Sequence, residues 1–390
     1  MGIKGLWKIV EPAAIERSLV NLVTIEGFER SQGRRSWIIG VDTSLWIDNC
    51  QAAFQGATIH THSGENPELR TFFFKLCRYL KMPVVLVFVL DGPGRPSVKR
   101  GRGVQPVPLW ITSYLEELVD AFGFFVHQAP GEAEAELARL NSLGIIDAIF
   151  TDDSDTLVFG GECIIRRSLL SFQLFLLSFM GKLALFSRPW KSTESDHVIL
   201  YTADSIEYSN GVKLTRGGLL LFALLAGGDY DAGIEGCGGN TARALAECSF
   251  GDELLDAATS LSGTNLQQFL HAWRKRLQTE LRYNSQGRLR CRNAGVAQKI
   301  TDKFPDLAVM EKYVTPLTSW SSQQGCQIPN TAGWGAREPS ISKITAFCLQ
   351  RFGWDRDGAV MKRFRMNLWP GVAFRMLCSV MSSSLSLAVC

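Results

Sequence analysis

The sequence predicts an α/β protein built on a parallel sheet, and three short apolar runs are the main evidence. Residues 37–42, 84–91 and 145–155 are rich in β-branched residues, are bounded by Gly or Pro, and carry aspartate at their ends. These are features of buried strands. Segments with helical spacing, such as 68–80 and 108–122, alternate with these runs up to about residue 160. This alternation is typical of a parallel sheet covered by helices.

Beyond these segments, the spacing of apolar, Gly and Pro residues predicts further elements. The helix start near residue 132 follows Pro and Gly and has acids in its first turn, as helix starts prefer. In chain order we expect a helix over 132–142, a pair of strands within 196–208, an apolar helix over 214–226, a glycine-rich turn at 233–239, a helix over 240–248 and mainly helices from about residue 249.

The composition is that of a globular protein with a large core. Of 390 residues, 46% are hydrophobic and 20% are charged, and the net charge is only +3. Nucleic-acid binding therefore depends on local clusters of charge rather than on the overall balance. The ten cysteines form no C-x-x-C pair, which favours reduced intracellular thiols. Residues 1–7 contain no apolar signal-peptide core.

Acidic residues at the predicted strand ends give the strongest functional signal. Ligands of an open parallel sheet bind beyond the carboxyl ends of its strands. Negative charges gathered there repel one another and favour a hard cation such as Mg²⁺ or Mn²⁺. A single strand-end aspartate is more often a turn or cap residue, so the prediction depends on the whole set. The candidate metal ligands are Asp42, Asp91, Glu132, Glu134, Asp153, Asp155 and Asp229.

The spacing of Glu132 and Glu134 restricts their geometry. On a regular helix, residues i and i+2 face about 200° apart. These two carboxylates share a site only if Glu132 lies at an irregular helix start. Glu132 and Glu136 would share a helix face more easily.

Two further patterns are weaker. The glycine-rich turn at 233–239 precedes a helix, where free backbone N–H groups bind phosphate or an ion, although an ordinary loop explains it equally well. Arg95, Lys99, Arg100 and Arg102 follow Asp91 and suit a phosphate backbone, or form a solvated surface.

Residues 168–186 are almost wholly apolar and approach the length of a membrane span. Gln173, several serines, Gly181 and Lys182 interrupt the run, which favours a buried or disordered insertion. The tail 382–390 is low in complexity and has no clear role.

Six short motifs together resemble a known nuclease family. They lie at residues 1–7, 41–44, 90–92, 129–135, 151–155 and 228–230. In this order and spacing they are similar to the successive motifs of the flap endonuclease / xeroderma pigmentosum group G (Rad2-type) nucleases. Residues 92–101, and more loosely 304–354, resemble the GEN/Yen branch, the eukaryotic Holliday-junction resolvases.

The resemblance implies a PIN-like core that holds two Mg²⁺ ions, with Mn²⁺ as a substitute, on the seven acids named above. It implies that Lys99 and Arg100 are catalytic residues that orient the scissile phosphate. It also implies a helix-two-turn-helix element that binds duplex DNA through a K⁺ ion. The implied DNA-binding residues are Gly2, Arg95, Lys99, Arg100, Gly236, Gly238, Gly239 and Asn240.

On this resemblance we expect a structure-specific DNA endonuclease, most concretely a Holliday-junction resolvase that also cuts 5′ flaps. Its partner is branched DNA, on which monomers dimerise; we expect no membrane partner and a nuclear location. The alternatives are a 5′-flap endonuclease or exonuclease without resolvase activity, and an inactive junction-binding protein. The expected regions are 1–95 and 128–230 (nuclease), 96–127 (basic gate), 231–300 (helix-two-turn-helix) and 301–390 (helical).

Three features depart from the family pattern. The apolar segment 168–188 replaces a polar linker and is either an insertion or an error in the gene structure. The 390 residues include no chromodomain, which the GEN branch leads us to expect. They also include no Gln-x-x-Leu-x-x-Phe-Phe clamp-binding box, which disfavours the replicative flap endonucleases.

Overall fold

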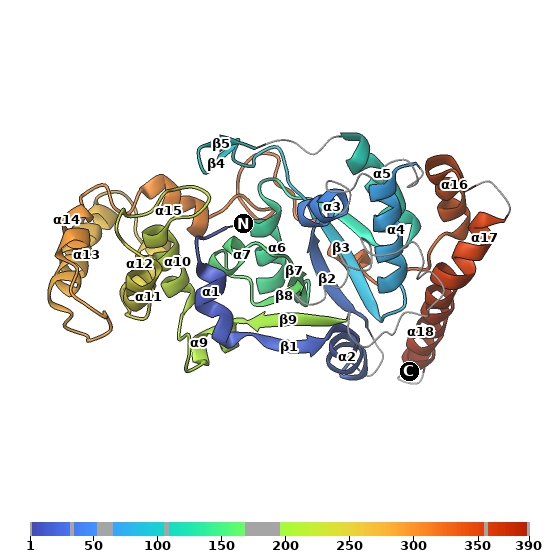
Figure 1. Cartoon of the computed structure of the whole chain (residues 1–390), viewed down its shortest axis with the longest axis horizontal. Coiled ribbons are helices and arrows are strands. Elements are labelled where there is room, and N and C mark those ends of the chain that lie inside the picture. The colour runs from blue at the N-terminus through green and yellow to red at the C-terminus, as the bar shows by residue number, and fades with distance from the viewer. Residues whose placement is uncertain are drawn as a thin grey trace.

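A seven-stranded sheet forms the centre of the protein, in the order β1-β9-β8-β7-β2-β3-β6 (Figure 1). The computed structural model describes residues 2–31, 35–52, 65–104, 109–167, 196–354 and 358–387. The strands β8, β7, β2, β3 and β6 run parallel, and β9 and β1 add an antiparallel edge. The predicted parallel α/β fold is therefore confirmed. The strands are β1 (Ile15–Ser18), β2 (Trp37–Asp42), β3 (Val84–Leu90), β6 (Phe125–Gln128), β7 (Ala148–Phe150), β8 (Cys163–Arg167) and β9 (His197–Thr202).

The strand register brings the carboxyl ends of three central strands to one level. Asp42 of β2 lies opposite Val89 of β3, and Val41 lies opposite Phe150 of β7. The residues that follow β3 and β7 therefore emerge beside Asp42, at the edge where parallel sheets bind their ligands.

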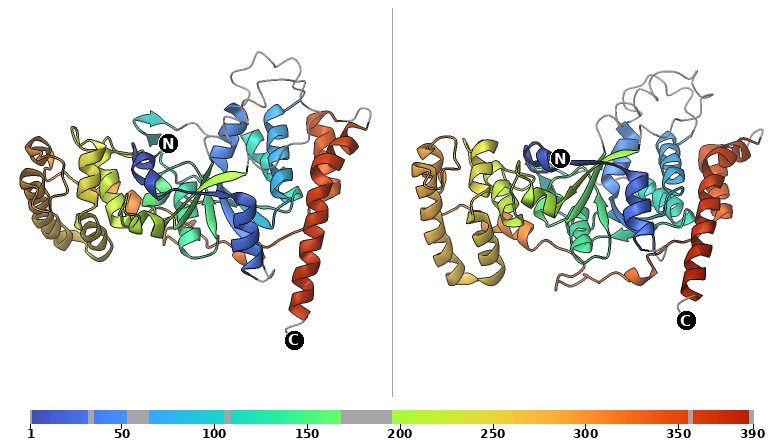
Figure 2. Two further views of the ribbon diagram at one scale, coloured as in Figure 1. Left: turned by 60° about the horizontal axis from the view of Figure 1, so that its bottom comes forward. Right: turned by 90° about the horizontal axis from the view of Figure 1, so that it is seen from below.

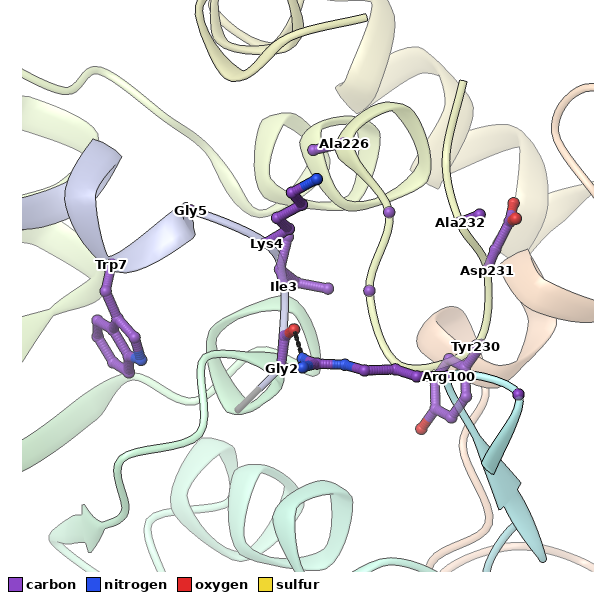
Figure 3. A pocket seen from close by; sticks show the side chains of 13 residues that line it. Gly2, Ile3, Lys4, Gly5, Trp7, Arg100, Ala226, Tyr230, Asp231 and Ala232 are labelled. Atoms are coloured by element: carbon purple, nitrogen blue, oxygen red, sulfur yellow. Dashed lines mark hydrogen bonds between the residues drawn. The ribbon is translucent and has the colours of Figure 1, made fainter. Parts of the chain in front are cut away.

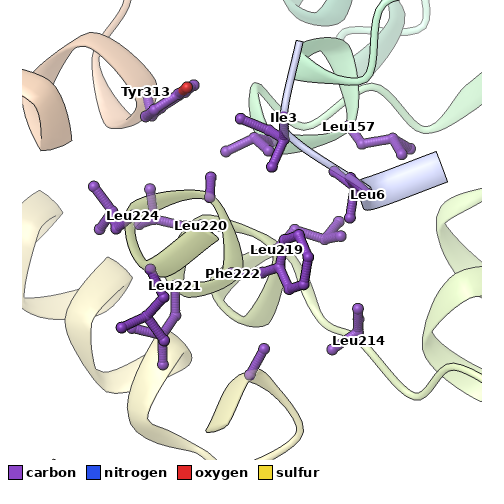
Figure 4. Close-up of a cluster of buried hydrophobic side chains, with 14 of the residues drawn as sticks. Ile3, Leu6, Leu157, Leu214, Leu219, Leu220, Leu221, Phe222, Leu224 and Tyr313 are labelled. Carbon is purple, nitrogen blue, oxygen red and sulfur yellow. The ribbon is translucent and has the colours of Figure 1, made fainter. Parts of the chain in front are cut away.

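Successive side chains of β3 point to opposite faces of the sheet and join an apolar cluster on each face. Val87 and Val89 join one apolar cluster, and Leu86 and Phe88 join the other. The first cluster includes side chains of α6 (Ala133–Ser142), α7 (Asp155–Val158) and α10 (Arg216–Ala226), as Figure 4 shows for α10 and the N-terminal residues Ile3 and Leu6. The second includes side chains of α3 (Thr43–Ala52), α4 (Pro67–Tyr79), α5 (Leu109–Ala121) and α16 (Ile341–Phe352).

Helices extend the molecule at both ends (Figures 1 and 2). One end is a helical lobe of α11 (Gly239–Ala246), α12 (Phe250–Ser260), α13 (Gly263–Tyr283), α14 (Ala294–Lys299) and α15 (Leu307–Val314). The other end carries α16, α17 (Ala359–Arg363) and α18 (Trp369–Leu387). The short elements α1 (Leu6–Val10), α2 (Leu19–Asn21) and α9 (Ala203–Tyr208) connect parts of the core. Among the described residues, no helix is long and apolar enough to cross a membrane.

The structure corrects three local predictions. Residues 196–208 are not a pair of strands, because β9 is followed by α9, where Thr202 and Ser205 cap each other's backbone N–H groups at 3.0 Å. The strand predicted within 145–155 is only Ala148–Phe150. A hairpin of β4 (Val98–Lys99) and β5 (Arg102–Gly103) lies within the predicted basic gate 96–127, where no strand was predicted. The apolar segment 168–188 lies outside the described residues.

Candidate active site

The structure gathers the seven predicted acids at the carboxyl edge of the sheet. Asp42 ends β2, Asp91 follows β3, Asp153 and Asp155 follow β7, Glu132 and Glu134 stand at the start of α6, and Asp229 follows α10. All except Asp91 are less than 9% exposed. Burial of this many carboxylates is costly unless cations or hydrogen bonds compensate for it.

Burial, and after it mutual repulsion, raises the pKa of several of these acids. Burial, together with the charges of Asp91 and Asp153, raises the pKa of Asp42 to about 6. The hydroxyl of Ser44, which donates to Asp42 Oδ1 at 2.7 Å, opposes this shift. Burial also raises the pKa of Glu134 and of Asp155 well above the ordinary values, and neighbouring carboxylates add to both shifts. Each acid is thus close enough to the others to feel their charges.

The start of α6 has the irregular geometry that the spacing of its acids requires. The helix begins at Ala133, and Glu132 precedes it in an extended conformation with φ −81° and ψ 139°. Asp91 Oδ1 accepts the Ala133 N–H at 2.9 Å, which joins the end of β3 to this helix start. Glu132 therefore lies at an irregular helix start, which is the condition under which Glu132 and Glu134 can share a site.

Glu136 lies apart from this acid cluster, although its spacing favoured a shared face with Glu132. Its carboxylate is fully buried, lies 2.8 Å from His127 Nε2, and accepts the Ser319 N–H at 2.8 Å. Glu136 therefore joins α6 to the segment that follows α15.

The β4–β5 hairpin brings Lys99 onto the acids rather than into solvent. Lys99 forms an ion pair with Glu132, and its Nζ lies 3.9 Å from Glu134 Oε1 and 3.8 Å from Asp229 Oδ2. Burial alone would lower the pKa of Lys99, but the charges of Glu134 and Glu132 outweigh it and raise the pKa. Lys99 therefore stays protonated among the acids.

Arg100 and Arg95 are also paired with predicted metal ligands. Arg100 Nε donates to Asp229 Oδ1 at 2.8 Å, and its guanidinium also donates to the Gly2 carbonyl. Arg100 and Gly101 both have positive φ (53° and 69°), as in the two-residue turns of tight hairpins. Arg95 lies 2.9 Å from Asp91 Oδ2.

The N-terminal segment docks directly on the acid cluster, and only glycine fits at position 2. The φ of Gly2 is +81°, and a Cβ there would lie 2.2 Å from Asp153 Oδ1 and 2.5 Å from Asp155 Oδ1. The Ile3 N–H donates to Ser154 Oγ at 2.8 Å. A pocket of about 850 Å³ opens beside this segment, between Arg100 and the turn 226–232 (Figure 3).

The predicted helix-two-turn-helix residues lie in a separate turn, between α10 and α11. Gly236, Gly238, Gly239 and Asn240 are all exposed, and α11 begins at Gly239. The first backbone N–H groups of α11 therefore lie at the surface of the helical lobe, where helix starts favour anions.

Two tyrosines beside the acids were missed by the sequence analysis. The Tyr230 hydroxyl donates to Glu132, and the Tyr313 ring packs on Tyr230 with centroids 4.8 Å apart. Tyr230 directly follows the predicted ligand Asp229, so its position in the sequence could have indicated that it lies near the acids. Tyr313 lies on α15, far along the chain, and no local pattern marks it.

In their donor chemistry, the gathered residues fit a hard divalent cation. Carboxylate oxygens suit Mg²⁺ and Mn²⁺, and Glu134 Oε2 and Asp155 Oδ1 are buried without a hydrogen-bond partner among the described residues. As the described side chains stand, no group of three or more His, Cys, Asp or Glu could hold one ion. Lys99 lies among the acids instead, so a bound cation would require Lys99 to move.

Fold and site together define a nuclease-type core: a parallel sheet with acids at its strand ends, covered by a basic hairpin and followed by a helical lobe. The sequence matches the XPG N-terminal domain over residues 1–105 and the XPG I-region over residues 123–229. These two matches cover more than half of the chain, and the chain belongs to the XPG family of nucleases.

Individual relatives agree with this assignment. Flap endonuclease GEN homolog 1 of Homo sapiens is 30% identical over 277 residues, which are 65% of this chain and 26% of that protein. The chain thus spans about a quarter of that relative's length. A structure of the Holliday junction-resolving enzyme GEN1 with product DNA and Mg²⁺ superimposes with a TM-score of 0.70 at 29% identity, covering 95% of this chain and 78% of that one. A structure of GEN-1 binding potassium has a TM-score of 0.68 at 29% identity, over the same shares.

Proposed function

We propose that this chain is a structure-specific DNA endonuclease that hydrolyses phosphodiesters in branched DNA with two divalent cations, Mg²⁺ or Mn²⁺. Its main substrate is the Holliday junction, and it also cuts 5′ flaps, in DNA repair and recombination. The observation that carries this proposal is the buried acid cluster beneath Lys99 and Arg100. Carboxylates and cations so close together suit a site for both metal ions and a phosphate.

The residues that would hold the cations are the seven acids of the cluster, Asp42, Asp91, Glu132, Glu134, Asp153, Asp155 and Asp229. Bound there, divalent cations supply a water nucleophile at neutral pH and stabilise charge on the leaving oxygen. Lys99 and Arg100 bind and orient the phosphate, and their charge offsets the negative charge of the diester. Gly2, with no side chain, lets the DNA backbone approach the acids closely.

The helical lobe is proposed to hold the duplex beside the cut. The exposed turn at Gly236, Gly238, Gly239 and Asn240 presents backbone N–H groups to phosphates, with K⁺ as a bridging ion. Arg95 adds a phosphate contact at the other side of the hairpin. On this proposal residues 231–300 are the DNA-binding region, and 1–95 with 128–230 form the nuclease core. Residues 96–127 form a gate, and 301–390 form a helical C-terminal region.

The small size of the gate favours the junction as substrate. Between Asp91 and the start of β6 the described elements are the β4–β5 hairpin and α5. A four-way junction has no free end to thread, so a short, open gate suits it. Two nicks require two active sites, so we infer a monomer that dimerises on the junction, in the nucleus where its substrate lies. A flap endonuclease without resolvase activity is the second candidate, since the same gate also admits a flap.

Cleavage assays on three blocked-end substrates test the proposal: a linear duplex, a 5′ flap and a four-way junction. With Mg²⁺ the protein is expected to cut the flap and the junction, and with a chelator neither. Asp153→Asn should cut at least about a thousandfold more slowly, because the loss of a metal ligand removes several kcal/mol of transition-state stabilisation. Its DNA affinity should stay nearly unchanged, since phosphate affinity comes mainly from cations.

Each contrary outcome has a distinct meaning. Cleavage of flaps without cleavage of the junction would identify the second candidate. Binding without any cleavage would identify a junction-binding protein. An Asp153→Asn variant as fast as the wild type would remove the acid cluster from the mechanism.

A further inference from the structure

Tyr313 lies against the acid cluster although it comes from α15, beyond both regions that match the XPG family. Its side chain is only 2% exposed. The ring packs on Tyr230 at 4.8 Å and on Phe159 at 5.8 Å between centroids. Figure 4 shows Tyr313 projecting from α15 toward Ile3. The ring is therefore held from several sides.

The Tyr313 hydroxyl is fixed in a space that Gly228 leaves open. A Cβ at Gly228 would lie 2.6 Å from Tyr313 Oη and 2.5 Å from Ile3 Cδ1. Gly228 directly precedes Asp229, one of the acids. The close approach of hydroxyl and backbone thus directs Tyr313 toward the cluster and leaves the hydroxyl little freedom to turn elsewhere.

An unpaired donor lies beside this cluster and an unpaired acceptor lies within it. Within the described part of the chain, Tyr313 Oη and Asp155 Oδ1 are both buried and without a hydrogen-bond partner. Burial, followed by the charge of Asp155, raises the pKa of Tyr313, so the hydroxyl keeps its proton. Buried polar groups are rarely left unpaired, because each such group has lost its water without gaining a partner.

The neighbouring tyrosine already makes the corresponding contact. Tyr230 donates its hydroxyl to the carboxylate of Glu132, another predicted metal ligand. Carboxylates that bind metals are usually held in turn by hydrogen bonds from a surrounding layer of side chains. Tyr230 and Tyr313, which pack on each other, occupy that layer.

We propose that Tyr313 is a positioning residue of the metal site, whose hydroxyl donates a hydrogen bond to Asp155 when the acids hold a divalent cation. The bond fixes the orientation of the Asp155 carboxylate and satisfies both unpaired groups. This inference rests on the proposed function, since it requires that the acid cluster bind metal. It makes α15 a contributor to the site, although α15 carries no predicted ligand.

The test compares Tyr313→Phe with the wild type and with Tyr79→Phe. Tyr79 is a matched control, because it is also buried and packs on Trp46 at 5.3 Å, but it lies on α4. Mn²⁺ affinity is measured by calorimetry on the DNA-free protein, and Tm is measured with and without Mg²⁺. For Tyr313→Phe we expect about tenfold weaker Mn²⁺ binding, as loss of such supporting hydrogen bonds typically costs.

The effect of the substitution on Tm should depend on whether metal is bound. Without metal, Tyr313→Phe should melt at the same temperature as the wild type or higher, because an unpaired buried hydroxyl has been removed. With Mg²⁺ its gain in Tm should be smaller than that of the wild type. The Mg²⁺ concentration for half-maximal cleavage should rise about tenfold, with a smaller change in the rate at saturating Mg²⁺. Tyr79→Phe should leave the metal response unchanged.

Three results would overturn the inference, and they differ in what they imply for the proposed function. If the wild type binds Mn²⁺ and Tyr313→Phe binds it equally well, Tyr313 only fills space and the proposed function stands. If the wild type itself binds no Mn²⁺, both proposals fail together. A Tyr313→Phe protein that melts lower without metal would also overturn it, because the hydroxyl would then have another, structural partner.

Discussion

The charge of Lys99 is closely constrained, because its ammonium lies among three carboxylates. Electrostatic interactions are stronger in such a buried site than at the surface. The ammonium makes it possible to bury Glu132, Glu134 and Asp229 together in this arrangement. It also repels any cation that enters. The same side chain therefore stabilises the site without metal and competes with metal for it.

Lys99→Ala separates these two effects. Without DNA, we expect this variant to bind Mn²⁺ at least about tenfold more tightly, because a positive charge within a few ångströms of the cation is gone. At saturating Mg²⁺ it should cleave DNA more slowly, because the phosphate loses a charged donor. Calorimetry and single-turnover cleavage measure the two quantities, and Lys8→Ala, at an exposed position of α1, is the control. Unchanged Mn²⁺ affinity would place Lys99 outside the cluster in solution.

At the scale of elements, the strands and most helices were predictable because their signals are local. The run over 84–90 is apolar throughout and becomes β3, an interior strand of the sheet, and 68–80 has the helical spacing of α4. Strand-end acids were predictable too, since parallel strands place their carboxyl ends at one edge. The hairpin β4–β5 was not, because each strand has two residues and its turn places Arg100 at a positive φ that glycine usually occupies.

Contacts between distant segments were the other limit of the sequence. Tyr313 reaches the acids, and Ser319 reaches Glu136, only through the tertiary fold. Glu136 pairs with His127 and does not join the acid cluster. This pairing depends on tertiary packing, which the spacing of residues along a helix does not predict. In contrast, the spacing of Glu132 and Glu134 alone indicated that α6 must start irregularly if both carboxylates are to share a site.

Glu136 gives α6 a test of its own. Glu136→Leu would leave the buried Ser319 N–H and the His127 ring without their acceptor, so we expect the free energy of unfolding to fall by about 1–3 kcal/mol. Glu136→Gln, which retains an acceptor oxygen, should lose less. Urea denaturation measures the difference, with the exposed Glu117→Gln as control. Equal stability of Glu136→Leu and the wild type would mean that this contact does not hold the C-terminal segment.

At the scale of the whole molecule, the sheet that carries the acid cluster lies between two helical ends. The helical lobe extends from one side of the sheet and α16–α18 from the other (Figures 1 and 2). The family matches end at residue 229, so the lobe and the end helices come from the remaining part of the chain. With a net charge of only +3, the proposed DNA binding would have to use local surfaces, and the hairpin and the start of α11 are the two proposed above.

The described residues of one molecule form one such acid cluster, so resolving a junction by paired cuts requires a second copy. We expect the protein to be monomeric in light scattering and to dimerise on a four-way junction. On a supercoiled plasmid with an extruded cruciform, paired nicks within one binding event give linear DNA, and single nicks give relaxed circles. The wild type should yield mainly linear product. Mixed with an equal amount of Asp153→Asn, only about a quarter of randomly formed dimers have two active sites, so relaxed circles should predominate. If the wild type alone gives relaxed circles, and the inactive partner does not alter the product, the copies act independently and dimerisation on the junction is wrong.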